Sequence, residues 1–109
     1  RIMKEGVEAV SEDLQELLKD CEAVYITVDM DVLDPASAPA VQNPEPDGLS
    51  TSILLDLLCK VCDSRVVGFD LTEVTPIYDS GTTSVQAAKI VFECICRLER
   101  TKRFRIRET

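Results

Sequence analysis

The sequence predicts an α/β protein built on a parallel sheet, and three consecutive segments lead to this class. Residues 23–28 (AVYITV) and 65–74 (RVVGFDLTEV) are short, mostly apolar runs of the kind found in buried strands. Between them, residues 50–64 carry apolar side chains at helical spacing. A strand, a helix and a strand in this order form a right-handed βαβ unit, so the two strands should be parallel, with their carboxyl ends at one edge.

A surface helix is expected before the first strand, over about residues 4–21. Acidic and basic residues separate its helically spaced apolar positions, which are Val7, Val10, Leu14, Leu17, Leu18 and Cys21. The strand that follows is apolar at nearly every position, which predicts that both of its faces are covered.

Residues 33–49 are predicted to form a long loop, because they contain residues that exclude helix and central strand: Pro35, Pro39, Pro44, Pro46 and Gly48. Loops this long are uncommon in compact domains unless they are functional, so we interpret this one as a stiffened functional surface. Ser50 or Thr51 can cap the following helix, which ends near residues 63–64.

After Pro76 stops the second strand, IYDSGTT forms another loop, and a third helix can be capped by Thr82, Thr83 or Ser84. That helix is expected to cover the sheet with its apolar residues Val85, Ala88, Val91, Phe92, Ile95 and Leu98. The basic tail KRFRIRET is predicted to be a solvated chain end whose cations complement a helix C-terminus.

The composition indicates a single globular domain over residues 1–109, with 45% hydrophobic and 29% charged residues. A net charge of −8 opposes binding to nucleic acid or to an anionic membrane surface and favours cationic ligands. Because no apolar run approaches the roughly 20 residues needed to span a bilayer, we expect a cytoplasmic protein.

Five cysteines are present and histidine is absent. Four of the cysteines lie among apolar residues at helix-like spacing, which predicts reduced, buried thiols: Cys59, Cys62, Cys94 and Cys96. A zinc site made by these four is the alternative, although ligand pairs normally lie on turns. The lack of histidine removes the usual base of a catalytic triad.

The segment VDMDVLDP places three carboxylates where the first strand ends. Because residues i and i+2 of a strand share a face, Asp29 and Asp31 should project together, and two adjacent carboxylates need a positive partner. A divalent cation with oxygen ligands, Mg or Mn, fits this need; capping of backbone amides is the alternative. Asp34 precedes Pro35 and is predicted to shape the loop by local hydrogen bonds.

Glu73 follows the second strand, at the sheet edge where ligands of open parallel sheets bind. It is a candidate metal ligand, base or clamp for a cationic substrate, with a solvent-facing charge as the alternative.

Taken together, VYITVDMDVLDPASAPAVQNPEPDGLS and GFDLTEVTPIYD resemble the C-terminal portion of the ureohydrolases, the family of arginase, agmatinase, guanidinobutyrase and formimidoylglutamase. The wording is most similar to agmatinases. The resemblance implies a three-layer α/β/α sandwich with a parallel sheet, a site with two Mn ions, and assembly into trimers or hexamers. It implies release of urea from a small cationic guanidino substrate, most simply agmatine.

By this resemblance Asp29 bridges both ions, Asp31 ligates one, Glu73 pairs with the substrate guanidinium, and Asn43 lies near a substrate-lining loop position. No residue of this chain is assigned a catalytic role beyond binding. The family motifs GGDHS and DAHxD, which supply the remaining metal ligands, are absent. We therefore expect a C-terminal portion of a longer enzyme that binds Mn weakly on its own and is inactive alone.

Three alternatives stay open at this point. One is another activity of the same family, arginase or formimidoylglutamase. A second is an Mg-dependent phosphatase with an Asp-x-Asp motif, although Gly-Thr or Gly-Val usually follows that motif and Val32-Leu33 follows here. The third is a non-catalytic structural module.

Overall fold

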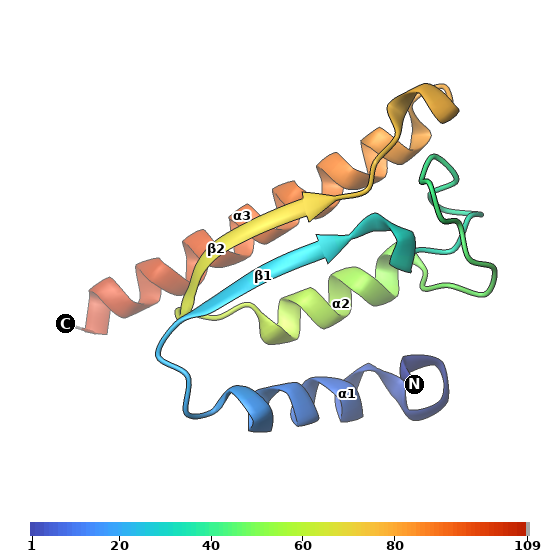
Figure 1. The fold of residues 1–109 in the computed structure, drawn as a ribbon. Coiled ribbons are helices and arrows are strands. Elements are labelled where there is room, and N and C mark those ends of the chain that lie inside the picture. The colour runs from blue at the N-terminus through green and yellow to red at the C-terminus, as the bar shows by residue number, and fades with distance from the viewer. Residues whose placement is uncertain (109) are drawn as a thin grey trace.

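The computed structural model describes residues 1–108, with the side chains described up to residue 102. Three α-helices, two strands and two short 3-10 helices (η) follow one another along the chain (Figure 1). Their bounds are α1 Ile2–Leu18, β1 Val24–Asp29, η1 Met30–Val32, α2 Thr51–Val61, β2 Val66–Thr72, η2 Pro76–Tyr78 and α3 Thr82–Glu108. The backbone of the basic tail thus continues α3 to Glu108, and its predicted solvation lies outside the described side chains.

Strands β1 and β2 pair in parallel, and α2 connects them, which confirms the predicted βαβ unit. The register aligns Thr27 with Asp70 and Asp29 with Thr72. Both strands therefore end at the same edge of the sheet, where the two long loops also lie (Figure 1). This edge carries the candidate site.

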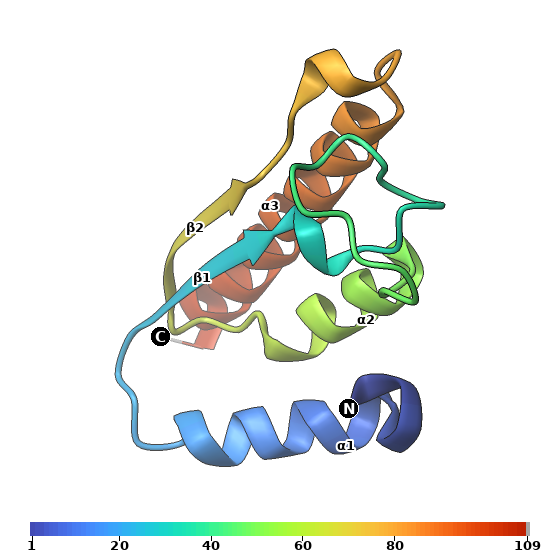
Figure 2. The same cartoon turned by 45° about the vertical axis from the view of Figure 1, so that its right-hand side comes forward.

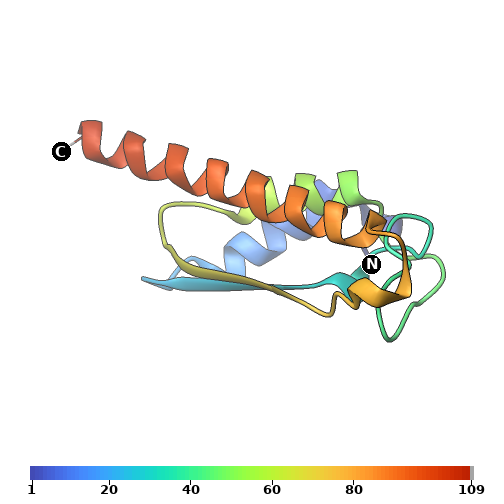
Figure 3. The same cartoon turned by 90° about the horizontal axis from the view of Figure 1, so that it is seen from above.

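Helices α2 and α3 cover one face of the sheet, and α1 lies alongside α2 (Figures 2 and 3). Apolar side chains of the strands, the helices and the long loop form the core between these layers. Its fully or almost fully buried members include Val28, Met30, Leu33, Ala38, Val41, Leu54, Leu58, Cys62, Ile90 and Cys94. The core reaches into the residues just after β1, so it fixes the base of the site.

The opposite face of the sheet is open within residues 1–108. Tyr25 of β1 is 61% exposed, and Thr27, two residues further on the same face, is exposed as well. The prediction that the first strand is covered on both faces is therefore wrong for this part of the chain, because side chains alternate between a buried and an open face. The α/β class with a parallel sheet is confirmed, and the described residues form two layers of it.

The helix boundaries follow from local hydrogen bonds. The Ser50 hydroxyl accepts from the amide of Ile53 at 3.2 Å, which confirms the predicted cap of α2. For α3, the carboxylate of Asp79 accepts from the amides of Gly81 and Thr83 at 2.9 and 3.0 Å, so an aspartate before the helix does the work predicted for a threonine or serine.

The face of α3 that packs on the sheet differs from the prediction. Val85, Phe92 and Ile95 are exposed, whereas Ala87, Ile90 and Cys94 are buried. Apolar side chains occur around most of this helix, so their spacing alone does not select a face.

Helix α1 is attached to α2 by polar contacts. Gln15 donates a hydrogen bond to the carbonyl of Lys60 at 2.9 Å, and Lys60 forms an ion pair with Glu8. The backbone is non-helical at Gly6, where φ is 87°. None of the helices in residues 1–108 is long and apolar enough to cross a membrane.

Candidate metal and substrate site

The two strand ends bring Asp29 and the Glu73 backbone to one edge. Asp29 is the last residue of β1 and lies beside Thr72, the last residue of β2, in the parallel register. Glu73 is the next residue along the chain. The sheet therefore places these two sequence-predicted residues at the carboxyl ends of adjacent strands, where ligands of parallel sheets bind.

Asp29 and Asp31 come together by a different route from the one predicted. The strand ends at Asp29, and Asp31 lies in η1, so the two do not share a strand face. Instead Asp29 caps η1, since its Oδ1 accepts a hydrogen bond from the amide of Asp31 at 2.8 Å. The turn brings the two residues close, and the capping predicted as an alternative is present as well.

The Oδ1 atom of Asp31 is the feature of this turn that points to a cation. It is buried and has no hydrogen-bond partner within the described residues. A buried carboxylate oxygen without a donor is costly, since it has lost water without replacement. A hard divalent cation accepts such an oxygen as a ligand, so the donor set of Asp29 and Asp31 fits Mg or Mn. Among the described side chains, those of residues 1–102, no cluster of three or more potential metal-ligating His, Cys, Asp or Glu occurs.

Asp34 shapes the long loop by a local hydrogen bond, as predicted, and also closes it by a second bond that was not predicted. Its Oδ1 accepts from the amide of Ala36 at 2.8 Å and its Oδ2 from the amide of Gly48 at 3.1 Å, which ties together the two ends of residues 34–48, the anchored loop. The amide of Ala36, with those of Gly48 and Asp47, holds the pKa of the Asp34 carboxyl below its usual value. Asp34 is thus a structural carboxylate.

The anchored loop is also fixed to the segment after β2. The amide of Thr75 donates to the carbonyl of Ala40 at 2.8 Å, and the amide of Ala40 donates to the Thr83 hydroxyl at 2.9 Å. Thr83 in turn donates to Asp79 at 2.7 Å, a bond that is the main cause of the lowered pKa of Asp79. The sequence analysis did not predict this chain of hydrogen bonds from Ala40 through Thr83 to Asp79, although the Asp-x-Gly pattern of the second loop is typical of an Asp turn.

Glu73 adopts an uncommon backbone conformation, with φ at 72°. A non-glycine residue in this left-handed region is strained, and such residues are enriched at functional sites. Its side chain is exposed at the sheet edge. Asn43 is exposed as well, within the outer part of the anchored loop, residues 42–47.

A carboxylate on the open face of the sheet was not among the predicted site residues. Asp70 of β2 accepts hydrogen bonds from the hydroxyls of Thr27 and Tyr25, both on β1. These bonds, chiefly that from Thr27, lower the pKa of Asp70. Gly68 leaves room for the Tyr25 ring, because a Cβ there would lie 2.4 Å from it. The network joins the two strands just before the site, and an aspartate inside a strand is the signal that could have revealed it.

The four cysteines of the alternative zinc site do not assemble into one. Cys62 and Cys94 are buried, but Cys59 and Cys96 are exposed, and the side chains described, up to residue 102, form no group of three ligands. The prediction of buried thiols is therefore correct for two of the four and wrong for the other two.

A parallel βαβ unit with carboxylates and an anchored loop at its carboxyl edge has the layout of α/β proteins that bind ligands at that edge. The Arginase family model matches residues 1–96, and the chain belongs to this family. An agmatinase of Chromobacterium violaceum is 37% identical over 98 residues, which are 89% of this chain and 30% of that protein. The human mitochondrial guanidino acid hydrolase is 45% identical over 76 residues, 69% of this chain and 22% of that protein.

Solved structures show the same arrangement. The crystal structure of agmatine ureohydrolase of Thermoplasma volcanium matches with a TM-score of 0.83 and 38% identity, over 94% of this chain and 33% of that one. An arginase from Bacillus subtilis matches with a TM-score of 0.79 and 28% identity, over 85% and 34%. The fold is thus arginase-like, and the chain spans about a third or less of the curated relatives and solved structures named here.

Proposed function

We propose that this chain is the C-terminal portion of a binuclear manganese hydrolase that releases urea from a guanidino substrate, with agmatine as that substrate. The observation that carries the metal site is the buried, unpartnered Oδ1 of Asp31 beside the Asp29 turn. The similarity to agmatinases supports the choice of agmatine. Because the chain has no histidine and the side chains of residues 1–102 form no group of three ligands, this part of the enzyme supplies only some of the ligands.

Each site residue has a distinct part in this proposal. Asp29 and Asp31 hold manganese, which lowers the pKa of a water molecule and so supplies a nucleophile at neutral pH. Glu73 binds the planar guanidinium by paired charge-assisted hydrogen bonds and orients its carbon. Asn43, on the exposed part of the anchored loop, contacts the far end of the substrate. The bonds of Asp34 and Thr75 hold that loop beside the strand ends.

The setting proposed for the enzyme follows from charge and thiol chemistry. Five free cysteines are consistent with a reducing compartment, and we assign the protein to the cytoplasm. The acidic composition suits a cationic substrate and disfavours nucleic acid. We further propose that the full-length protein forms trimers or hexamers.

The test is a urea assay on the full-length protein loaded with Mn, offering agmatine, arginine, guanidinobutyrate and formimidoylglutamate side by side. We expect urea from agmatine at the highest kcat/KM, and no turnover by residues 1–109 alone. Preference for arginine, or formamide from formimidoylglutamate, would move the protein to another activity of the family. Phosphate release from a phosphomonoester without any urea would refute the hydrolase assignment.

Replacing Glu73 with glutamine is expected to raise KM for the guanidino substrate by about one to two orders of magnitude, because a neutral amide loses a charge-assisted bond. Bound metal, measured by atomic emission, should not change. Glutamine keeps the size of the side chain, and Glu12→Gln, at an exposed position of α1, is the matched control. An unchanged KM for Glu73→Gln would show that the residue has another role.

A further inference from the structure

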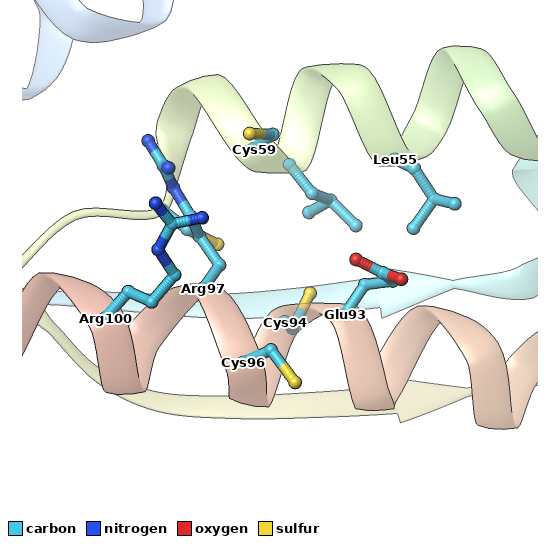
Figure 4. A pocket seen from close by; sticks show the side chains of 9 residues that line it. Leu55, Cys59, Glu93, Cys94, Cys96, Arg97 and Arg100 are labelled. Atoms are coloured by element: carbon cyan, nitrogen blue, oxygen red, sulfur yellow. The ribbon is translucent and has the colours of Figure 1, made fainter.

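A cavity between α2 and α3 lies away from the candidate site and is lined by cysteines and arginines. It has a volume of about 160 Å³ and is bounded by Leu55, Leu58, Cys59, Cys62, Glu93, Cys94, Cys96, Arg97 and Arg100. Figure 4 shows Cys94 and Arg97 of α3 directed toward α2, whereas Cys96 points away from it. Two of the thiols therefore face different surroundings from the other two.

Cys62 and Cys94 are neighbouring free thiols at the wall of this cavity. Both are 2% exposed and belong to the same buried core cluster, where the two thiols interact directly. Cys62 caps the C-terminal end of α2 and Cys94 lies midway along α3. A bond between their sulfurs would join the two helices that cover the sheet.

The charges around the pair favour a thiolate on Cys62. The neighbouring Cys94 thiol is the main cause that lowers the pKa of Cys62, and the positive charge of Arg97 adds to it, while burial and Asp63 act in the opposite direction. The Nε of Arg97 is buried without a hydrogen-bond partner within the described residues, so this cation lies close to the thiols with no carboxylate on that atom.

We propose that Cys62 and Cys94 are a thiol–disulfide exchange site that reacts with small disulfides reaching it through this cavity. The Cys62 thiolate attacks one sulfur of a disulfide RSSR, so a Cys62–SR bond forms and RS⁻ leaves with the electron pair of the broken bond. Cys94 then gives its proton to the RS⁻ that left first, and its thiolate attacks the Cys62 sulfur, which expels the second RS⁻; this thiolate takes a proton from water. The two protein thiols are oxidised to one disulfide, and RSSR is reduced to two thiols.

The test equilibrates the reduced full-length protein with bis(2-hydroxyethyl) disulfide and 2-mercaptoethanol at pH 7.5. Acid quenching, alkylation and peptide mass spectrometry then map the bonds. We expect a Cys62–Cys94 disulfide, with Cys21, Cys59 and Cys96 recovered as free thiols. In Cys94→Ser the reaction should stop at the mixed disulfide on Cys62, whereas Cys59→Ser combined with Cys96→Ser should leave the disulfide unchanged.

Arg97→Gln should raise the pKa of Cys62 and so slow its modification, by about threefold for each unit of pKa. The reason is that the thiolate fraction falls faster than the nucleophilicity of the thiolate grows. Arg100→Gln is the comparison. The rate of Cys62 modification is then measured at several low urea concentrations. If the disulfide enters through the cavity, the rate stays constant; if it enters by unfolding of the protein, the rate rises with urea. A rate that tracks unfolding, or oxidation of Cys59 and Cys96 while Cys62 stays reduced, would overturn the proposal. Circular dichroism checks the fold of the Cys94→Ser variant. If that variant misfolds, Cys94→Ala replaces it, and the reaction should again stop at the mixed disulfide on Cys62.

Discussion

Replacing Asp31 with asparagine is expected to weaken manganese binding by the full-length protein by more than about 100-fold. The loss of a residue that only hydrogen-bonds to a metal ligand costs roughly 10–100-fold in affinity, and the loss of a ligand should cost more. The buried Oδ1 of Asp31 has no hydrogen-bond partner within the described residues, so a cation is its natural partner. Asparagine keeps the shape but removes the charge. Urea production should fall together with the metal content, and calorimetric titration with Mn measures the first of these.

The matched control is Asp47→Asn. Asp47 is an exposed carboxylate of the anchored loop with φ at 64°, a conformation that asparagine tolerates well, so the variant changes the net charge equally without strain. Metal binding should be unchanged in this control. Full metal content in Asp31→Asn would mean that the unpartnered oxygen is not a ligand.

Replacing Gly48 with alanine is expected to destabilise the protein by about 1–3 kcal/mol, the usual cost of forcing extra atoms into a packed position. A Cβ at Gly48 would lie 2.6 Å from the amide nitrogen of Asp34 and 2.8 Å from the carbonyl carbon of Leu33. Both are backbone atoms, so a side-chain rotation cannot relieve the contact. The two ends of the anchored loop must separate, and the bond from Gly48 to the Asp34 carboxylate weakens with them.

Urea denaturation measures the loss of stability, and the same variant should raise KM because the anchored loop is displaced at the strand ends. Glu45→Ala is the control, since Glu45 is exposed in the outer part of the same loop. Wild-type stability in Gly48→Ala would show that the close approach at residues 33 and 34 is not a constraint on this position.

Local chemistry explains what could be predicted from the sequence. The Ser50 cap and the local hydrogen bond of Asp34 depend on residues close together in the chain, the βαβ order depends on the succession of apolar patterns, and the structure bears all three out. The resemblance to a family could be recognised from the short segments VDMDVLDP and EVTP alone, without any knowledge of the fold. The roles of Asp29, Asp31, Glu73 and Asn43 stay predictions until metal and substrate binding are measured.

Features that depend on distant contacts were missed. The strand ends at Asp29 because η1 begins there, and the alternation rule applied to Asp31 assumed a longer strand. The buried face of α3 is chosen by small residues, Ala87 and Cys94, which a count of large apolar positions overlooks. The left-handed conformation of Glu73 has no signal in its residue type, since glycine or asparagine is usual there.

The anchoring of the loop separates the part that can vary from the part that cannot. The bond between Asp34 and Gly48 secures the ends of the loop, and the bond from Thr75 secures its middle. The loop residues Ala38, Ala40 and Val41 are buried in the protein. Residues 42–46 are exposed and contribute none of these anchoring groups, whereas Asp47 has φ at 64° and its amide donates to the Asp34 carboxylate. A library randomised only over residues 42–46 would therefore sample new substrate preferences on an intact scaffold, which makes this stretch the natural target for engineering.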